Sequence, residues 1–150
     1  MDFDNKDYII RFIEKNDFHY CYLDLLNQLS TFNIDQINII DFNEFIDNLN
    51  NNHMIYVIED INSQLIIGTG TLLIENKIIH NMGKLGHIED IVIHSKYRGQ
   101  KLGKYLINFL SNMAKELNCY KVILDCNDEN IFFYEKCNFK RNGNQMSIYF

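Results

Sequence analysis

The residues best suited to chemistry lie in one stretch, residues 86–104, which reads GHIEDIVIHSKYRGQKLGK. Its first half alternates and is rich in β-branched residues, which predicts a mostly buried strand over residues 87–93. Glu89 and Asp90 interrupt this strand, and carboxylates in a buried strand are costly unless something pairs with them. We therefore expect the two either to pair with Arg or Lys of the chain or to contact a substrate.

A glycine-punctuated basic turn follows and leads into apolar residues at helical spacing, which are Leu102, Leu106, Phe109, Leu110, Met113 and Leu117. A strand, a glycine-rich turn and a helix N-terminus together form a phosphate site, because the first-turn N–H groups have no intrahelical partner. Arg98, Lys101 and Lys104 add positive charge. The turn matches neither GxxxxGK[ST] nor GxGxxG, so the alternative is a surface turn with scattered lysines.

Composition limits the classes of protein that this chain can represent. A length of 150 residues with 47% hydrophobic and 23% charged residues fits one globular domain with a single sizeable core. The formal net charge of −6 argues against a nucleic-acid binder, which normally carries a basic face. An anionic substrate must then be bound by a local cluster of cations.

The cysteines and the N-terminus point to a cytoplasmic protein. Cys21, Cys119, Cys126 and Cys137 have no CxxC spacing, so we expect no metal site and no disulfide framework, and interpret them as buried free thiols. The acidic start MDFDNKDY is typical of neither a signal nor a transit peptide, and no apolar run approaches the ~18 residues that would span a membrane.

The periodicities predict a single domain with a mixed sheet, of the α/β or α+β class. Asp17 is a plausible N-cap for the first helix, and Gly68 and Gly70 within a strand indicate a bulge or a close backbone approach. The long helix between residues 87–93 and 121–126 makes those two strands parallel. Strands are expected at residues 8–13, 54–59, 65–74, 87–93, 121–126, around 139 and at 145–150, and helices at 17–30, 41–49, 102–117 and 130–136.

Residues 98–103 resemble the pyrophosphate loop of the GNAT family of N-acetyltransferases, [QR]-x-x-G-x-[GA], with Lys101 where the middle glycine is usual. GHIEDIVI before the loop and CYKVILDC and NIFFYEKCNF after it follow in family order. Together they resemble one branch, the glucosamine 6-phosphate N-acetyltransferases. The resemblance implies the GNAT fold, with a central mixed, largely antiparallel sheet flanked by helices.

The same resemblance implies acetyl-CoA as the cosubstrate, without a metal. In the family, the amide near Ile91 polarises the thioester carbonyl. Asn130 matches a position that contacts the cofactor, and a simple helix N-cap is its alternative. The implied cofactor-binding residues are Ile91, Val92, Ile93, Arg98, Gly99, Gln100, Lys101, Leu102, Gly103, Lys104 and Asn130.

Tyr134, Glu89 and Asp125 are the implied catalytic residues. Tyr134 matches a tyrosine beside the thioester sulfur, where a phenol can protonate the departing thiolate. Its alternative is a place in an aromatic core with its phenylalanine neighbours. One carboxylate accepts the proton of the amine, and the sequence does not decide which one. Cys126 is interpreted as a core residue.

The implied substrate-binding residues are Ser30, Lys77, His80, Glu89, Asp90, Tyr120, Lys121 and Asp125. Lysine side chains bind phosphate through charge-assisted hydrogen bonds. The family tends to end with a basic residue that helps to hold the phosphate, whereas this chain ends in SIYF. That apolar, strand-like tail is suited to pairing with a second chain, and the family forms homodimers with shared active sites.

The expected reaction is direct attack by glucosamine 6-phosphate on acetyl-CoA in a ternary complex, giving N-acetylglucosamine 6-phosphate on the route to UDP-N-acetylglucosamine. Two alternatives remain open. One keeps the fold and acetylates a protein or polyamine amine, which the net charge of −6 favours mildly. The other is a non-catalytic CoA-binding module, because Lys101 replaces a loop glycine.

Overall fold

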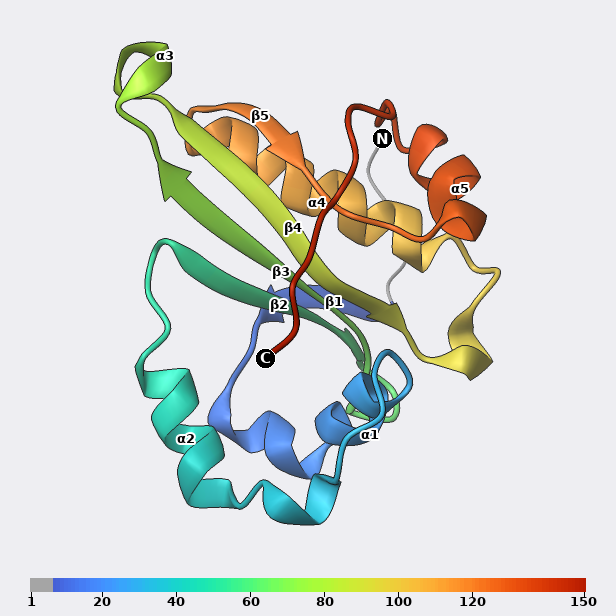
Figure 1. Cartoon of the computed structure of the whole chain (residues 1–150). Helices are drawn as coiled ribbons and strands as arrows, with labels where there is room; N and C mark the ends of the chain where they lie inside the picture. The colour runs from blue at the N-terminus through green and yellow to red at the C-terminus, as the bar shows by residue number, and fades with distance from the viewer. Residues whose placement is uncertain (1–6) are drawn as a thin grey trace.

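A five-stranded mixed sheet organises the chain in the computed structural model, which describes residues 7–150 (Figure 1). The strands lie in the order β1-β2-β3-β4-β5, and all neighbours are antiparallel except β4 and β5, which are parallel. The bounds are β1 Tyr8–Phe12, β2 His53–Asp60, β3 Leu65–Asn76, β4 Lys84–Ile93 and β5 Cys119–Ile123. This confirms the predicted mixed, largely antiparallel sheet.

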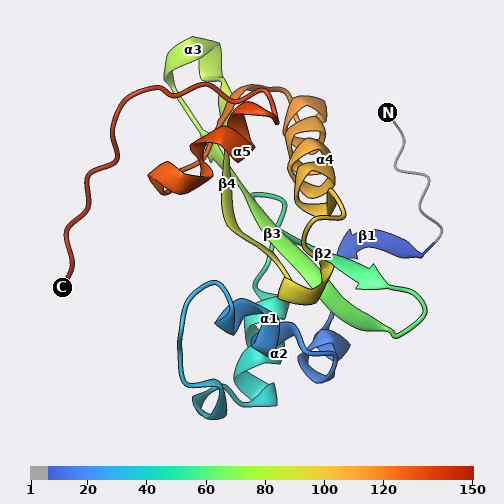
Figure 2. The same ribbon diagram turned by 90° about the vertical axis from the view of Figure 1, so that its right-hand side faces the viewer.

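Helices cover both faces of the sheet, with α4 and α5 on one side and α1 and α2 on the other (Figure 2). The α-helices are α1 Tyr22–Asn27, α2 Ile39–Asp47, α3 Ile79–Met82, α4 Leu102–Glu116 and α5 Ile131–Glu135. The 3₁₀ helices are η1 Lys15–His19, η2 Ile34–Gln36, η3 Ser95–Tyr97 and η4 Asp128–Asn130. Within residues 7–150, no helix combines the length and apolarity needed to cross a bilayer.

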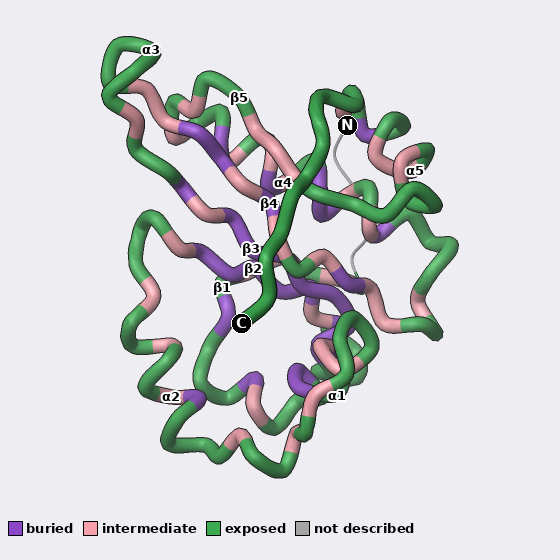
Figure 3. The backbone as a smooth tube through the Cα atoms, viewed as in Figure 1, coloured by how far each residue is buried: buried purple, intermediate pink, exposed green. Residues whose placement is uncertain are grey.

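Two apolar cores fill the space between the sheet and these helices. The predicted face of α4 buries Leu102, Leu106 and Leu110, which pack against residues such as Leu72 and Ile88 of the sheet. Alternate side chains of the same strands point to α1 and α2 and form the second core. The buried stretches of β2 to β4 and α4 lie at the centre of the molecule in Figure 3. They give the site a rigid frame.

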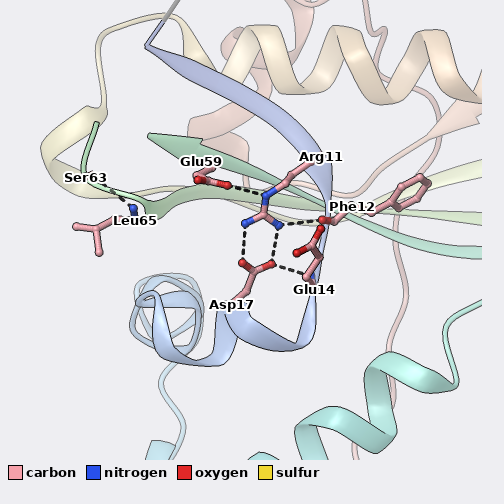
Figure 4. A network of polar contacts seen from close by, with 7 residues as sticks. All are labelled: Arg11, Phe12, Glu14, Asp17, Glu59, Ser63 and Leu65. Atoms are coloured by element: carbon pink, nitrogen blue, oxygen red, sulfur yellow. Dashed lines mark hydrogen bonds and ion pairs between the residues drawn. The ribbon is translucent and has the colours of Figure 1, made fainter. Parts of the chain in front are cut away.

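The first helix differs from its prediction because Asp17 is not its N-cap. Asp17 lies inside η1, is 1% exposed and receives two hydrogen bonds from Arg11, at 2.7 and 2.9 Å (Figure 4). Cys21 then adopts a left-handed φ of 64°, so α1 begins only at Tyr22. A buried carboxylate needs charged partners, and the Arg11 guanidinium fixes Asp17 in a position that interrupts the helical run.

The C-terminal segment also differs from its prediction. Residues 140–150 are all exposed and contain no strand, and the chain there extends away from the sheet and helices (Figures 2 and 3). β5 spans Cys119–Ile123 rather than residues 121–126, and it is a partly exposed edge strand rather than a buried one. A strand needs a neighbour for its backbone groups, and residues 145–150 do not return to their own sheet.

The cysteines are free, but the prediction that they are buried is wrong for most of them. Cys137 is buried and Cys119 intermediate, whereas Cys21 and Cys126 are exposed. Cys126 follows β5, the edge strand of the sheet. It is therefore not a core residue.

Candidate active site

The loop between β4 and α4 presents a row of unpaired backbone donors. None of the N–H groups of residues 99–104 donates to an acceptor among residues 7–150. Gly99 and Lys101 adopt left-handed φ angles of 83° and 65° just ahead of the α4 N-terminus. A left-handed position favours glycine, which explains why the loop motif normally has glycine where Lys101 stands. This arrangement suits an anion.

Arg98 and the α4 dipole strengthen the positive potential of this loop. The Arg98 Nε donates to the carbonyl oxygen of Ile93 at 3.1 Å, which holds the guanidinium beside the end of β4. Lys101 and Lys104 are exposed at the start of α4. Positive side chains beside free N–H groups at a helix N-terminus can bind a diphosphate.

A bulge in β4 interrupts its pairing with β3 next to this loop. Thr69 pairs with Val92 and Thr71 with Glu89, so Asp90 and Ile91 have no partner residue in β3. Asp90 accordingly adopts a left-handed φ of 53°. A Cβ on Gly70 would collide with the Ile91 side chain, so the glycine permits this close approach. The sequence prediction of a bulge at the strand glycines is confirmed.

β4 extends well beyond the end of its parallel neighbour β5. Their pairing ends at His87 with Ile123, after which β4 continues to Ile93 while the chain after β5 turns toward α5 (Figure 1). Residues 88–93 therefore have no strand partner on the β5 side among the described residues. The backbone of Ile91 to Ile93 lies in this divergence, and a narrow extended ligand could pair with it.

Glu89, Asp90 and Asp125 form a carboxylate group beside the divergence. Burial, followed by the charges of Asp125 and Asp90, raises the pKa of Glu89, and His87 opposes the shift. Within residues 7–150, none of the three carboxylates forms an ion pair. The His87 charge offsets this repulsion only in part, since the pKa of Glu89 is still raised, and this suits a site for a cationic ligand or for proton acceptance.

Tyr134 faces the same region from α5. It lines a cavity together with Asp125 and Cys126, and its ring contacts Phe133 and Phe139 edge-on at 5.0 and 6.2 Å. Burial, then the neighbouring Cys126, Cys137 and Glu89, raises its pKa to about 12. The phenol is therefore protonated at neutral pH, and Tyr134 is at once part of the aromatic cluster and close to the carboxylates.

Asn130 and Cys126 lie beside this region. Asn130 is at the N-cap position of α5, but its side chain makes no cap hydrogen bond, so its amide is available to a ligand. Burial, and then Asp128 and Asp125, raise the pKa of the Cys126 thiol. An elevated pKa disfavours the thiolate, so Cys126 is poorly suited to act as a nucleophile although it is exposed.

The predicted phosphate-binding cations gather at the other end of β4, around the β3–β4 hairpin. The His80 ring lies 4.2 Å from that of Tyr120, and the Lys121 Nζ lies 5.8 Å from the same ring. Lys77 forms an ion pair with Glu75, which also contacts the Nε2 of His87 at 3.0 Å. Glu75, at the end of β3 and two residues before Lys77, is not among the residues predicted from the sequence.

Within one chain, the predicted substrate residues form separate groups. The hairpin cations lie near Lys84, seven residues along β4 from Ile91, which corresponds to about 23 Å at ~3.3 Å per residue. Ser30 lies at the opposite end, because its neighbour Gln28 accepts a hydrogen bond from the Ser95 N–H at 2.9 Å. A small sugar phosphate with its amine near Ile91 cannot reach the hairpin cations of the same chain.

The described residues contain no group of three His, Cys, Asp or Glu side chains that could hold a metal ion. The site therefore offers amides, carboxylates, a phenol and cations. That chemistry can bind a diphosphate, take a proton from an amine and donate one to a leaving group.

Comparison with known proteins identifies relatives over almost the whole chain. The model of the Acetyltransferase (GNAT) family matches residues 15–139. Glucosamine 6-phosphate N-acetyltransferase of Arabidopsis thaliana is 43% identical over 144 residues, covering 94% of this chain and 95% of the relative. Glucosamine 6-phosphate N-acetyltransferase 1 of Dictyostelium discoideum is 40% identical over 137 residues, or 91% and 87% of the two chains. The crystal structure of the Arabidopsis thaliana enzyme superimposes with a TM-score of 0.91 at 40% identity, covering 95% and 98%.

Proposed function

This chain belongs to the GNAT family of acetyltransferases and, within it, to the glucosamine 6-phosphate N-acetyltransferases, and from this we propose its reaction. It transfers the acetyl group of acetyl-CoA to the 2-amine of glucosamine 6-phosphate, giving N-acetylglucosamine 6-phosphate and CoA. The product leads toward UDP-N-acetylglucosamine. The observation that carries the proposal is the row of unpaired amides at residues 99–104 next to the group of Glu89, Asp125 and Tyr134.

The protein holds acetyl-CoA by its backbone more than by side chains. The amides of residues 99–104, with Arg98, Lys101 and Lys104, bind the diphosphate. The pantetheine arm extends along residues 91–93 in the divergence between β4 and β5, and Asn130 contacts it from the start of α5. The Ile91 amide, which has no partner residue in β3, donates to the thioester carbonyl oxygen.

Acetyl-CoA supplies an acetyl group already activated as a thioester, so no nucleophilic side chain is needed. The neutral amine attacks the carbonyl carbon, a C–N bond forms and the C–S bond breaks. Glu89 is the base that takes the amine proton, directly or through water, because burial and the charges of Asp125 and Asp90 raise its pKa. Tyr134 donates its hydroxyl hydrogen to the departing sulfur.

The sugar binds between carboxylates and cations, and two copies of the chain are required to bring these together. Asp90 and Asp125 bind the hydroxyls and amine, and Ser30 lies at the same end of β4. Because the cations of one chain lie about 23 Å from its own Ile91, Lys77, His80 and Lys121 bind the phosphate in the site of a second copy. Tyr120 supports the His80 ring.

The homodimer also accounts for exposed apolar surface. Ile78, Ile79 and Met82 at the hairpin are 85, 64 and 73% exposed, and the tail exposes Ile148 and Tyr149 as well. A cationic hairpin facing the anionic site of a partner is electrostatically complementary. We place the protein in the cytoplasm, because its four free thiols suit a reducing compartment.

Free-thiol release from acetyl-CoA by the purified protein tests the reaction, with glucosamine 6-phosphate and glucosamine as parallel acceptors. We expect turnover with the phosphorylated sugar and at least a 100-fold lower kcat/KM with glucosamine, because the phosphate forms charge-assisted bonds of about 1.5–3 kcal/mol each. Turnover of a polyamine or peptide amine but of neither sugar would contradict the proposal.

A further inference from the structure

Side chains outside the proposed site form hydrogen bonds to the loop of residues 98–104 and to Tyr97, which precedes it. Tyr97, the residue before the loop, donates its hydroxyl hydrogen to the Oδ2 of Asp60 at 2.9 Å. Asp60 is the last residue of β2 and lies 37 residues before Tyr97 in the chain. The contact therefore connects the start of the loop to the β2–β3 turn.

Asp60 is a buried acceptor whose other oxygen is also bonded. The carboxylate is 8% exposed, and its Oδ1 accepts from the N–H groups of Asn62 and Ser63 at 3.0 and 3.4 Å. Burial alone would raise the pKa of Asp60, but hydrogen bonds from Tyr97, Ser63 and Asn62 together lower it. The acceptor is thus ionised at neutral pH, and the Tyr97 contact is a charge-assisted hydrogen bond.

Tyr8 provides a second contact to the same loop from β1. Its hydroxyl donates to the Oε1 of Gln100 at 2.9 Å, and its ring packs edge-on against Tyr97 at 6.3 Å. Tyr8 and Asp60 are register partners in β1 and β2. The two tyrosines therefore hold the loop at Tyr97 and at Gln100 from one edge of the sheet.

We propose that Asp60, Tyr97 and Tyr8 form a brace that keeps residues 98–104 in the conformation that binds the diphosphate of acyl-CoA. They are positioning residues, because none of them belongs to the row of amides. Gly99 is flexible and Lys101 is strained in its left-handed conformation, so the loop can adopt other conformations. Molecules in those conformations cannot bind the diphosphate, which lowers the apparent affinity. The brace raises that population before the ligand arrives. The inference depends on the proposed function only in the choice of acyl-CoA as the anion.

Three substitutions test the brace, with CoA binding measured by calorimetry without any acceptor sugar. Tyr97→Phe and Tyr8→Phe keep the rings and remove only the hydroxyls, and Asp60→Asn removes the charge. We expect Tyr97→Phe to weaken CoA binding about fivefold and to raise the KM for acetyl-CoA by the same factor. This effect is smaller than the loss of a hydrogen bond made directly to a charged ligand, because the hydroxyl acts only on the loop conformation. The kcat at saturating acetyl-CoA and the KM for the amino sugar stay at parental values.

The matched control is Asp17→Asn, which disturbs a buried ion pair between β1 and η1 without touching the loop. It lowers the melting temperature but leaves CoA binding unchanged, which separates positioning from general destabilisation. In an Asp60→Asn background, Tyr97→Phe adds little further loss, because the two residues act through one contact. Unchanged CoA affinity in folded Tyr97→Phe would overturn the brace. If CoA binds normally but no sugar is acetylated, the proposed function fails while the brace remains testable.

Discussion

At the scale of single residues, the site contains two groups whose pKa values are both raised but whose tasks differ. Burial and neighbouring carboxylates make Glu89 a stronger base than an ordinary glutamate. Burial raises the pKa of Tyr134 to about 12 and keeps its proton in place at neutral pH. The same region thus supplies both a proton acceptor and a hydrogen donor.

Tyr134→Phe tests the donor. We expect kcat to fall about 100-fold, near the lower end for general acid catalysis, because a phenol with a pKa of about 12 is a weaker acid than a thiol with a pKa of about 8.5. The ring packing is preserved, so CoA affinity by calorimetry stays at the parental value. A kcat within twofold of the parent would assign Tyr134 to the aromatic core alone.

Glu89→Gln tests the base and also carries a prediction about stability. The pKa of Glu89 is higher in the folded protein than in the unfolded chain, where it is about 4.3. As pH rises from that value through the folded pKa, the free energy of unfolding falls, because ionisation is disfavoured only in the folded state. Removing the carboxyl group should therefore abolish turnover yet raise the melting temperature at pH 7, with little difference near pH 4. The control is Glu44→Gln on the exposed surface of α2. A lower melting temperature at pH 7 would contradict the direction of the shift.

Lys101→Gly tests why the loop tolerates a non-glycine residue. The left-handed φ of 65° costs a non-glycine residue about 1 kcal/mol, partly offset by the greater unfolded-state entropy of glycine. We expect unfolding by urea to show a stability equal to or up to ~1 kcal/mol above the parent. CoA affinity should fall less than in Lys101→Ala, which keeps the strain and loses the charge. A clear loss of stability in Lys101→Gly would show that the loop is not strained there.

At the scale of elements, one ion-pair cluster joins the N-terminal strand β1 to η1 and β2. Arg11 on β1 binds Asp17 of η1 and Glu59 of β2, the latter at 2.6 Å, and so joins three elements around one guanidinium (Figure 4). Asp17 and Glu59 raise the pKa of Arg11, with the Asp17 hydrogen bond as the largest cause and burial opposing. The cluster thus fixes η1, which precedes α1, against β1 and β2.

Arg11→Met should destabilise the protein by about 3 kcal/mol, because it leaves the Asp17 carboxylate, which is 1% exposed, without its cation. Chemical denaturation measures the change. The double variant Arg11→Met, Asp17→Leu should recover part of the loss, since no buried charge then remains unpaired. Equal stabilities of the single variant and the parent would mean that solvent reaches Asp17 readily.

At the scale of the whole molecule, the edge strand β5 and the exposed tail could pair with each other as strands, but within one chain they do not. β5 carries unpaired backbone groups on its outer edge among the described residues, and residues 145–150 are an extended apolar segment without a neighbour. Strand exchange between two copies would satisfy both.

Truncation after residue 144 tests this association. We expect the parent to migrate as a dimer in size-exclusion chromatography with light scattering, and the truncated chain to be monomeric at low micromolar concentration. Activity should fall with the dimer, because the hairpin cations would no longer reach a partner site. Lys15→Ala, which removes an exposed ion pair with Asp47, is the control and should remain dimeric. A truncated chain that stays dimeric and active would refute the role of the tail.

The sequence alone determined the features that depend on local pattern. Strand alternation, the helical period of residues 102–117 and the glycines of β3 predicted the sheet, α4 and the bulge, because each feature depends on contacts repeated every two to four residues. The order of motifs along the chain identified the family, and with it the residues of the loop and the carboxylate group.

The tertiary structure decided what depends on partners far along the chain. Asp17 looked like a helix cap and is instead a buried anion, because Arg11 reaches it from another element. The brace of Tyr8, Asp60 and Tyr97 joins residues up to 92 positions apart, as in the Tyr8–Gln100 bond, and no local pattern encodes it. The predicted C-terminal strand is absent because a strand's hydrogen bonds belong to its neighbour, and within this chain the described residues provide none.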